Sequence, residues 1–233
     1  MGPKLSAIRS NALISNVVDV VFPARCAGCG HRGVWVCDEC IDTIARLSPP
    51  WCGRCGIPID SRCRCDELSP AISISRSAAV YSGWVRRAIH LMKYENEPAR
   101  IPSLAEFMAS AARALPPFDA LVPAPLHSAR NRGRGYNQSE ILANELATHL
   151  GCQVSRCLVR TRSTRQQVGL DRDARHRNVT GAFAVVPAEK VAGKRLVLVD
   201  DVMTTGSTLN ACAETLGAAG ASWVGTLTLA REI

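Results

Sequence analysis

The chain has 233 residues, of which 47% are hydrophobic and 5% aromatic, and its formal net charge is +8. This composition excludes an intrinsically disordered protein and predicts an aliphatic core, enough for one large domain or a small module with a medium one. Arginine supplies almost all of the positive charge, because lysine occurs at only four positions. Guanidinium groups suit phosphate-bearing ligands, although an arginine preference can also reflect genome composition alone.

Residues 1–21 are predicted to form a short amphipathic helix. Apolar side chains recur through this segment, but Arg9, Asn11, Asn16 and Asp19 interrupt them. No uninterrupted apolar run is long enough for a membrane span or a secretory signal. The spacing favours a helix that packs on the rest of the protein, and we expect the protein to be cytoplasmic.

Residues 22–70 are predicted to form a cysteine-rich zinc module. Eight of the eleven cysteines lie here, in three C-x-x-C pairs and one C-x-C pair: Cys26, Cys29, Cys37, Cys40, Cys52, Cys55, Cys63 and Cys65. Without a secretory signal, thiolates that bind a metal are favoured over disulfides, and structural zinc is favoured over redox pairs or an iron–sulfur cluster. Four sulfurs complete one tetrahedral Zn²⁺ site, so eight predict two structural zinc ions.

The sequence leaves the pairing of these cysteines open. The simplest arrangement is sequential, with the first four cysteines on one zinc ion and the last four on the other. An interleaved cross-brace would use the same eight residues. The isolated cysteines Cys152, Cys157 and Cys212 are predicted to be small buried apolar residues.

From residue 71 onward, strands are expected to alternate with helices. The expected strands are 78–81, 120–122, 196–199 and 223–229, and the expected helices are 85–93, 104–115, 141–150 and 208–219. The purely apolar run at 196–199 is typical of a strand covered on both faces. Such alternation predicts an α/β domain at 71–233, with a mostly parallel sheet flanked by helices.

The most informative pattern lies between Arg195 and Leu209. Asp200 and Asp201 directly follow the apolar strand, and a loop of hydroxyl residues around Gly206 then leads into a helix. In open α/β sheets ligands bind at the carboxyl ends of strands, and the N–H groups of a helix N-terminus bind phosphate. The carboxylates suit ribose hydroxyls, or a Mg²⁺ that also contacts pyrophosphate. Ordinary helix capping needs only one Asp, Ser or Thr, so it does not explain two acids and four hydroxyl residues around a glycine. The segment also lacks the Walker sequence of nucleotide-binding P-loops.

This pattern resembles the motif with which type I phosphoribosyltransferases bind phosphoribosyl pyrophosphate (PRPP). The resemblance extends to Val122-Pro-Ala-Pro-Leu126, Arg132-Gly-Arg-Gly-Tyr-Asn-Gln138, Arg165-Gln-Gln167 and Arg175-x-x-Asn178-x-x-Gly181-Ala-Phe183. With an N-terminal double zinc ribbon, these segments are similar to the competence-associated ComF family, from about residue 13 to residue 231. The resemblance implies a double zinc ribbon at 22–70 and a type I phosphoribosyltransferase-like domain at 71–233.

The resemblance also implies roles for individual residues. Asp200 and Asp201 would hold the ribose hydroxyls, with Mg²⁺ accompanying PRPP. The 5′-phosphate would lie on the loop formed by Thr204, Thr205, Gly206, Ser207 and Thr208. The turn at Pro123–His127 would be the pyrophosphate loop, with Pro125, Leu126 and His127 as substrate-binding candidates. Residues 162–178 would be a closing hood, with Arg165 and Arg175 as catalytic candidates. Lys93 matches a Lys-Tyr pair of the family and is a further substrate-binding candidate.

The implied reaction transfers ribose 5-phosphate from PRPP to an acceptor and releases pyrophosphate. Phosphoribosyltransferases that act on 6-oxopurines usually carry an aspartate where this chain has Thr204, so purine salvage is not expected and the acceptor stays open. The alternative is a protein without turnover, which keeps the PRPP pocket as a sensor or as a scaffold in DNA import.

Positive charge is concentrated between residues 130 and 177. Ten arginines lie there against four acidic residues, a surplus of six charges. The phosphates of PRPP would account for much of this surplus, and the family's link to DNA uptake implies single-stranded DNA and DNA-uptake proteins as further partners. Because Tyr136 is the main aromatic residue among these arginines, DNA contacts are expected to be mainly electrostatic. The sequence leaves the oligomeric state open.

Overall fold

The computed structural model describes residues 24–95, 97–126, 135–162, 181–186 and 189–233. The helix predicted at 1–21 lies outside these ranges. His127, Arg165 and Arg175 lie outside them as well, together with nearly all of the predicted hood.

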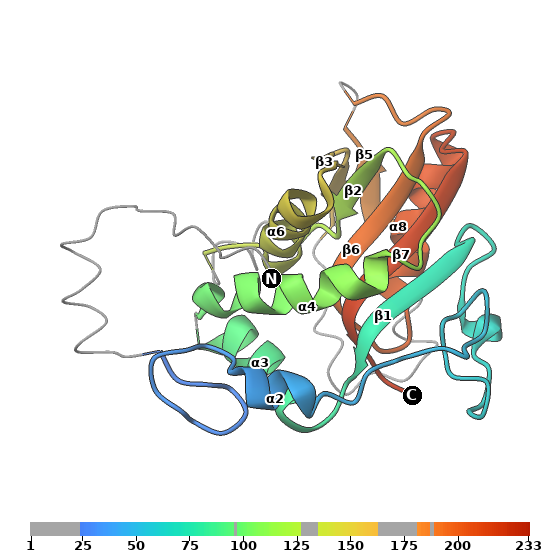
Figure 1. The fold of residues 1–233 in the computed structure, drawn as a ribbon. Helices are drawn as coiled ribbons and strands as arrows, with labels where there is room; N and C mark the ends of the chain where they lie inside the picture. The colour runs from blue at the N-terminus through green and yellow to red at the C-terminus, as the bar shows by residue number, and fades with distance from the viewer. Residues whose placement is uncertain (1–23, 96, 127–134, 163–180, 187–188) are drawn as a thin grey trace.

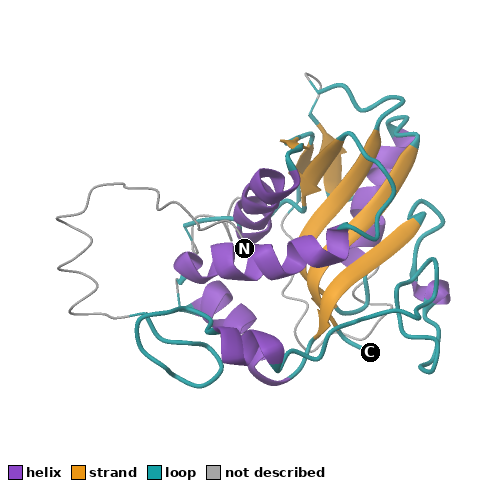
Figure 2. Ribbon diagram, in the orientation of Figure 1, coloured by secondary structure: helices purple, strands orange, loops and turns teal. Residues whose placement is uncertain are grey.

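A five-stranded parallel sheet organises the larger part of the molecule (Figures 1 and 2). Its strands are β1 (Ile74–Val80), β2 (Ala120–Pro123), β3 (Gln153–Val154), β6 (Arg195–Met203) and β7 (Trp223–Arg231). They lie in the order β1-β7-β6-β2-β3, and each neighbouring pair is parallel. The predicted α/β class and mostly parallel sheet are therefore confirmed.

Helices cover both faces of this sheet (Figure 2). On one face lie α3 (Gly83–Tyr94), α4 (Ile101–Ala112) and α6 (Gln138–Leu150), and on the other lie α8 (Ser207–Ala218) and the small antiparallel pair β4 (Leu158–Arg160) and β5 (Phe183–Val185). Each face has its own hydrophobic cluster. We call them the α4 cluster, which includes Leu104, Leu142 and Val197, and the α8 cluster, which includes Leu198 and Leu209.

The two halves of the cysteine-rich module pack on opposite faces of the sheet. The first half, which contains the short helix α2 (Asp38–Asp42), contributes Val36 and Ile44 to the α4 cluster. The second half, which ends in the 3-10 helix η1 (Cys65–Glu67), contributes Ile57 and Leu68 to the α8 cluster. The module is thus built into the core of the sheet domain, and the boundary at residue 70 remains a prediction.

The connection between the two halves covers the outer edge of β1. The N–H of Leu47 donates to the carbonyl of Ala78 at 3.2 Å, and the N–H of Val80 donates to that of Ala45 at 2.8 Å. Unpaired edge strands can pair with other chains, so this contact protects the sheet. A second 3-10 helix, η2 (Pro98–Arg100), leads into α4. Among the described residues, every helix is too short or too polar to cross a bilayer.

Candidate functional site

The eight clustered cysteines form two groups, and within each group the sulfur atoms lie within 4.8 Å of one another. One group is Cys26, Cys29, Cys37 and Cys40, and the other is Cys52, Cys55, Cys63 and Cys65. Five sulfur–sulfur separations within these groups run from 3.5 Å to 3.8 Å. A tetrahedron with bonds of about 2.3 Å to zinc has edges of about 3.8 Å, and a disulfide measures about 2.05 Å. The residues therefore fit two zinc ions, and the sequential pairing is the one that the structure adopts.

The local backbone of each group suits a turn around a metal ion. The N–H groups of Cys55 and Arg54 point at the sulfur of Cys52 and lower its pKa to about 6. In the first group, a Cβ atom at Gly28 would collide with the sulfur of Cys40, so only glycine fits there. These features are typical of a knuckle that turns around a metal ion.

Two buried arginines lie beside the second group of cysteines. Arg231, which is 1% exposed, donates from Nη1 to the carbonyl of Cys55, and Arg76 donates from Nη2 to the carbonyl of Gly53 at 3.0 Å. Burial lowers the pKa of both guanidinium groups, and the thiolate charge of Cys55 opposes this effect. Four thiolates around one Zn²⁺ carry a net charge of −2, so these arginines compensate it.

The acid pair lies near the C-terminal end of β6. Asp200 is half-buried and Asp201 is 2% exposed. The sequence placed the end of the strand at Val199, but β6 continues to Met203 and pairs with β7 over its whole length. The acids therefore lie within the strand, and Asp201 is less open than the sequence suggested.

Lys93, at the C-terminal end of α3, contacts Asp201 directly. Its Nζ lies 2.7 Å from Asp201 Oδ1. Burial opposes the charge on Lys93, but attraction to Asp201 and Asp200 outweighs burial and raises the pKa of the lysine. The second carboxylate oxygen of Asp201 is buried and has no hydrogen-bond partner among the described residues. A buried carboxylate oxygen without a donor is costly, and it fits a sugar hydroxyl or a cation.

Asp200 is held by hydrogen bonds to one of its oxygens. Ser139 Oγ, in the first turn of α6, donates to Asp200 Oδ1 at 2.7 Å, and the N–H of Asp201 donates to the same oxygen at 2.9 Å. Burial and the charge of Asp201 raise the pKa of Asp200 to about 6, against the opposing effects of Lys93 and Ser139. A ligand that donates a hydroxyl to this carboxylate would stabilise its ionised form.

The loop after β6 leads into the N-terminus of α8. Gly206 has a φ of 72°, and a Cβ there would lie 2.8 Å from Met203 Cε, so both backbone conformation and space favour glycine. Within the described part of the chain, no side chain caps the first turn of α8. Thr205 Oγ1 and Ser207 Oγ are hydrogen-bonded at 2.8 Å. Uncapped N–H groups and adjacent hydroxyls make this N-terminus suitable for a phosphate.

The predicted pyrophosphate loop lies at the same edge of the sheet. Pro125 and Leu126 follow β2, which neighbours β6, and the N–H of Ala124 donates to the carbonyl of Val199 at 2.9 Å. The structure thus brings the described part of this turn, Lys93 and the acid pair to neighbouring strand and helix ends. His127 lies outside the described residues.

The segment that joins these parts was noticed in the sequence, but its contacts and Ser139 were not predicted. Tyr136 OH donates to the carbonyl of Met92, next to Lys93. Asn137 caps α6 by accepting from the N–H of Ser139, and it also donates to the carbonyl of Ala124 at 3.1 Å. The motif quoted from the sequence ends at Gln138, one residue before Ser139. A hydroxyl residue two positions after a capping asparagine was the available signal.

Both parts of the chain match known protein families. Residues 17–69 match the double zinc ribbon domain, and residues 137–233 match the phosphoribosyl transferase domain. The DNA utilization protein YhgH of Salmonella typhi is 33% identical over 215 residues, which cover 87% of this chain and 92% of that protein. Competence protein F of Haemophilus influenzae is 30% identical over 226 residues, which cover 90% of this chain and 98% of that protein.

Among solved structures, the allosteric regulatory enzyme of purine biosynthesis matches 57% of this chain and 25% of its own, with a TM-score of 0.39 and 21% identity. That likeness is too weak to support an argument. The two domain matches and the two relatives, which span nearly the whole chain, agree with each other and with the observed fold. The chain therefore belongs to the ComF family, in which a type I phosphoribosyltransferase domain follows a double zinc ribbon.

Proposed function

We propose that this chain binds PRPP with Mg²⁺ and transfers its ribose 5-phosphate group to an acceptor. The observation that carries the proposal is the buried, unpartnered oxygen of Asp201, which lies in the strand that leads to the uncapped N-terminus of α8. A ribose would place its hydroxyls on Asp200 and Asp201, and its 5′-phosphate on the loop from Thr204 to Thr208. The match to the phosphoribosyl transferase domain over residues 137–233 supports this assignment.

The reaction breaks the bond between C1 of the ribose and the pyrophosphate oxygen. Pyrophosphate leaves with the electron pair, the acceptor forms the new bond to C1, and the acceptor gives up a proton. C1 of the ribose develops positive charge and would react readily with water, so the site has to exclude water. We assign this to the segment 162–178, with Arg165 and Arg175 on the leaving pyrophosphate. Mg²⁺ would neutralise charge on that leaving group.

Lys93 and Ser139 have a positioning role in this proposal. The lysine offsets one of the two negative charges of the acid pair, which lowers the repulsion between adjacent carboxylates. Ser139 holds one oxygen of Asp200 and leaves its other oxygen for a hydroxyl. The acid pair is thereby fixed in orientation before PRPP arrives.

Calorimetric titration with PRPP and Mg²⁺ tests the binding site. The double variant Asp200→Asn with Asp201→Asn keeps the shape of both side chains and removes their charge. Loss of two charge-assisted hydrogen bonds should weaken PRPP binding at least about 100-fold. The control is Glu214→Gln, an exposed acid on α8, which should bind PRPP as the wild type does. Equal affinity of the wild type and the double variant would refute the assigned roles.

Pyrophosphate release distinguishes an enzyme from a sensor. Wild-type protein saturated with PRPP should release pyrophosphate when the right acceptor is added, and the double variant should not. If PRPP binds but no class of acceptor causes release of pyrophosphate, the pocket acts as a PRPP sensor and not as an active site.

A role in DNA uptake or utilization is the second part of the proposal. It rests on the relatives named DNA utilization protein YhgH and competence protein F. We place this role in the cytoplasm and assign single-stranded DNA to the arginine-rich segment between residues 130 and 177. Binding of an oligonucleotide should then weaken steeply as salt is raised, because phosphate contacts release counterions. Absence of binding at low salt would argue against a direct DNA contact.

A further inference from the structure

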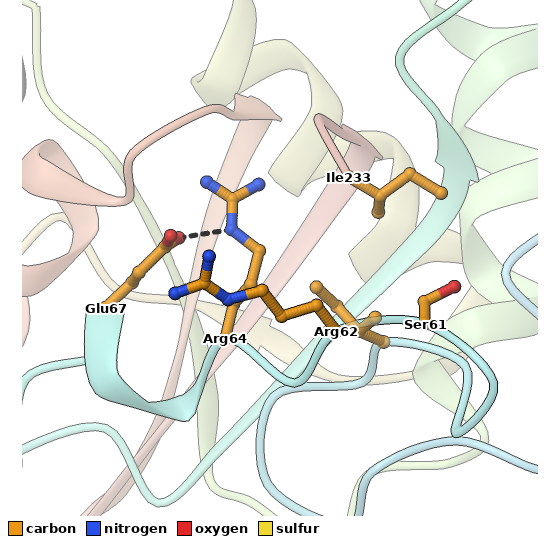
Figure 3. A pocket seen from close by; sticks show the side chains of 6 residues that line it. Ser61, Arg62, Arg64, Glu67 and Ile233 are labelled. Atoms are coloured by element: carbon orange, nitrogen blue, oxygen red, sulfur yellow. Dashed lines mark ion pairs between the residues drawn. The ribbon is translucent and has the colours of Figure 1, made fainter.

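A pocket of about 560 Å³ lies between the second zinc group and the C-terminal residues (Figure 3). Its lining residues are Ile57, Ser61, Arg62, Arg64, Glu67 and Ile233. This volume is within the range of small-molecule sites, about 300–1,000 Å³.

Hydrogen bonds connect this pocket to both ends of the phosphate loop. Before the loop, the carbonyl of Met203 accepts from the N–H of Glu232 at 3.0 Å, and the carbonyl of Glu232 accepts from Arg64 Nη1 at 2.7 Å. After the loop, Asn210 Nδ2 donates to the carbonyl of Glu67 at 2.7 Å. These bonds link the lining of the pocket to the residues on either side of the phosphate loop, on the face of the sheet that carries α8.

Among the charged side chains that line the pocket, one has no described partner. Arg64 Nε lies 2.6 Å from Glu67 Oε2, so these two residues neutralise each other. Arg62 is exposed, and no ion pair or hydrogen bond joins its side chain to another described residue. In Figure 3 its guanidinium reaches toward the Arg64–Glu67 pair, while Ile233 lies across the pocket. One unpaired guanidinium, with isoleucines elsewhere in the lining, suits an apolar body that carries an anionic group.

The position of these arginines in the chain explains why they can form a defined site. Arg62 and Arg64 flank Cys63, which belongs to the second cysteine group. A zinc ion bound there would fix the backbone that carries both side chains. The second half of the zinc module would then position a binding residue in addition to stabilising the fold.

We propose that this pocket is the acceptor subsite, and that the acceptor is a small molecule with a carboxylate or phosphate group on an apolar body. The inference rests on the proposed PRPP reaction and adds the chemical class of its second substrate. Arg62 recognises the anionic group, and a different group of the acceptor attacks C1 of the ribose. A recess of this size suits a small molecule better than a nucleic-acid backbone, which needs an extended groove.

The test uses phthalate and phenyl phosphate as probes of the full-length, zinc-loaded protein saturated with PRPP and Mg²⁺. Ligand-observed NMR should show binding of phthalate or phenyl phosphate, and no binding of the uncharged phthalamide. An interligand Overhauser effect between the ring protons of the bound probe and the ribose protons of PRPP should appear, because an acceptor that attacks C1 has to lie next to the ribose. Tighter binding of phthalate would indicate a carboxylate site, and tighter binding of phenyl phosphate a phosphate site.

Arg62→Ala should weaken binding of the preferred probe at least about tenfold. Arg32→Ala, an exposed arginine of the first cysteine group, is the matched control and should leave it unchanged. If PRPP binds but neither probe does, or if Arg62→Ala binds them equally well, the inference is wrong. Probe binding without the Overhauser effect would also overturn the inference. So would a result in which Arg62→Ala weakens the binding of an oligonucleotide but not the binding of the probes. Failure of PRPP binding itself, measured first without probes, would count against the proposed function.

Discussion

Asp200 illustrates the conflict between stability and binding at the level of a single side chain. Its pKa of about 6, raised by burial and by Asp201, means that the folded protein disfavours the ionised carboxylate. The folded pKa lies above the unfolded value of about 3.9, so this residue lowers stability as the pH rises from about 4 to about 6. Above that window the destabilisation is complete.

Asp200→Asn should therefore stabilise the protein without ligand at pH 7, by about 1–2 kcal/mol. The full pKa shift corresponds to a somewhat larger stabilisation. Two effects reduce it: Asp200 is partly in contact with solvent, and in the variant Ser139 donates to a neutral amide instead of a carboxylate. Thermal unfolding at pH 7 and at pH 3.5 or so checks this, because the difference should disappear once the wild-type carboxyl is protonated in both states. A variant less stable than the wild type at pH 7 would contradict the assigned environment.

Individual residues of the site were predictable where they are adjacent in the chain. The acid pair and the loop around Gly206 form one continuous pattern, so their roles could be proposed from sequence. Ser139 was missed because its contact with Asp200 joins residues 61 positions apart. The burial of Arg231 was missed for the same reason, since nothing near it in sequence shows that it lies against Cys55.

At the scale of elements, Asn210 connects α8 to the second half of the zinc module. It lies in the first turns of the helix, it is buried, and its side chain bonds the N–H of Ser69 at 2.9 Å and the carbonyl of Glu67 at 2.7 Å. The N-terminal part of α8 is thereby anchored to the second half of the zinc module.

Asn210→Ala should lower the free energy of unfolding by about 2 kcal/mol, because it leaves a backbone donor and acceptor without partners. PRPP affinity should also fall, since one end of the phosphate loop loses its anchor. Chemical denaturation and calorimetry measure the two effects. Asn144→Ala, an exposed asparagine of α6, should change stability by less than about 0.5 kcal/mol. Equal stability of the two variants would show that the contact contributes little.

The structure contains all eight strands and helices that the sequence predicts, but some of them begin or end at other residues than expected. β1 begins at Ile74 rather than at residue 78, because Ser75 and Ser77 are buried. Their hydroxyls bond Thr226 and Thr228 of β7 at 2.8 Å and 2.6 Å. Polar residues satisfied by a neighbouring strand cannot be told from loop residues in sequence alone. The short β3, β4 and β5 give no periodic signal.

For the whole molecule, metal binding and folding should be inseparable. We predict two zinc ions per chain by elemental analysis, and about one in Cys63→Ser, which removes a ligand from the second group only. Cys152→Ser, at an isolated cysteine, should retain both ions. No zinc in freshly purified, reduced wild-type protein would overturn this prediction.

The fragment 71–233 should not fold as the intact chain does. Without the zinc module it loses Val36 and Ile44 from the α4 cluster, and Ile57 and Leu68 from the α8 cluster. Both faces of the sheet would then expose apolar surface, so we expect binding of a hydrophobic dye and poorly dispersed NMR spectra. A fragment with native-like dispersion would show instead that the domain boundary at residue 70 is also a folding boundary.

A crystal structure grown with PRPP and Mg²⁺ tests the central claim most directly. We predict ribose hydroxyls on Asp200 and Asp201, with the 5′-phosphate on the loop from Thr204 to Thr208 at the N-terminus of α8. PRPP bound elsewhere, or an acid pair that remains without ligand at saturating PRPP, would contradict the account.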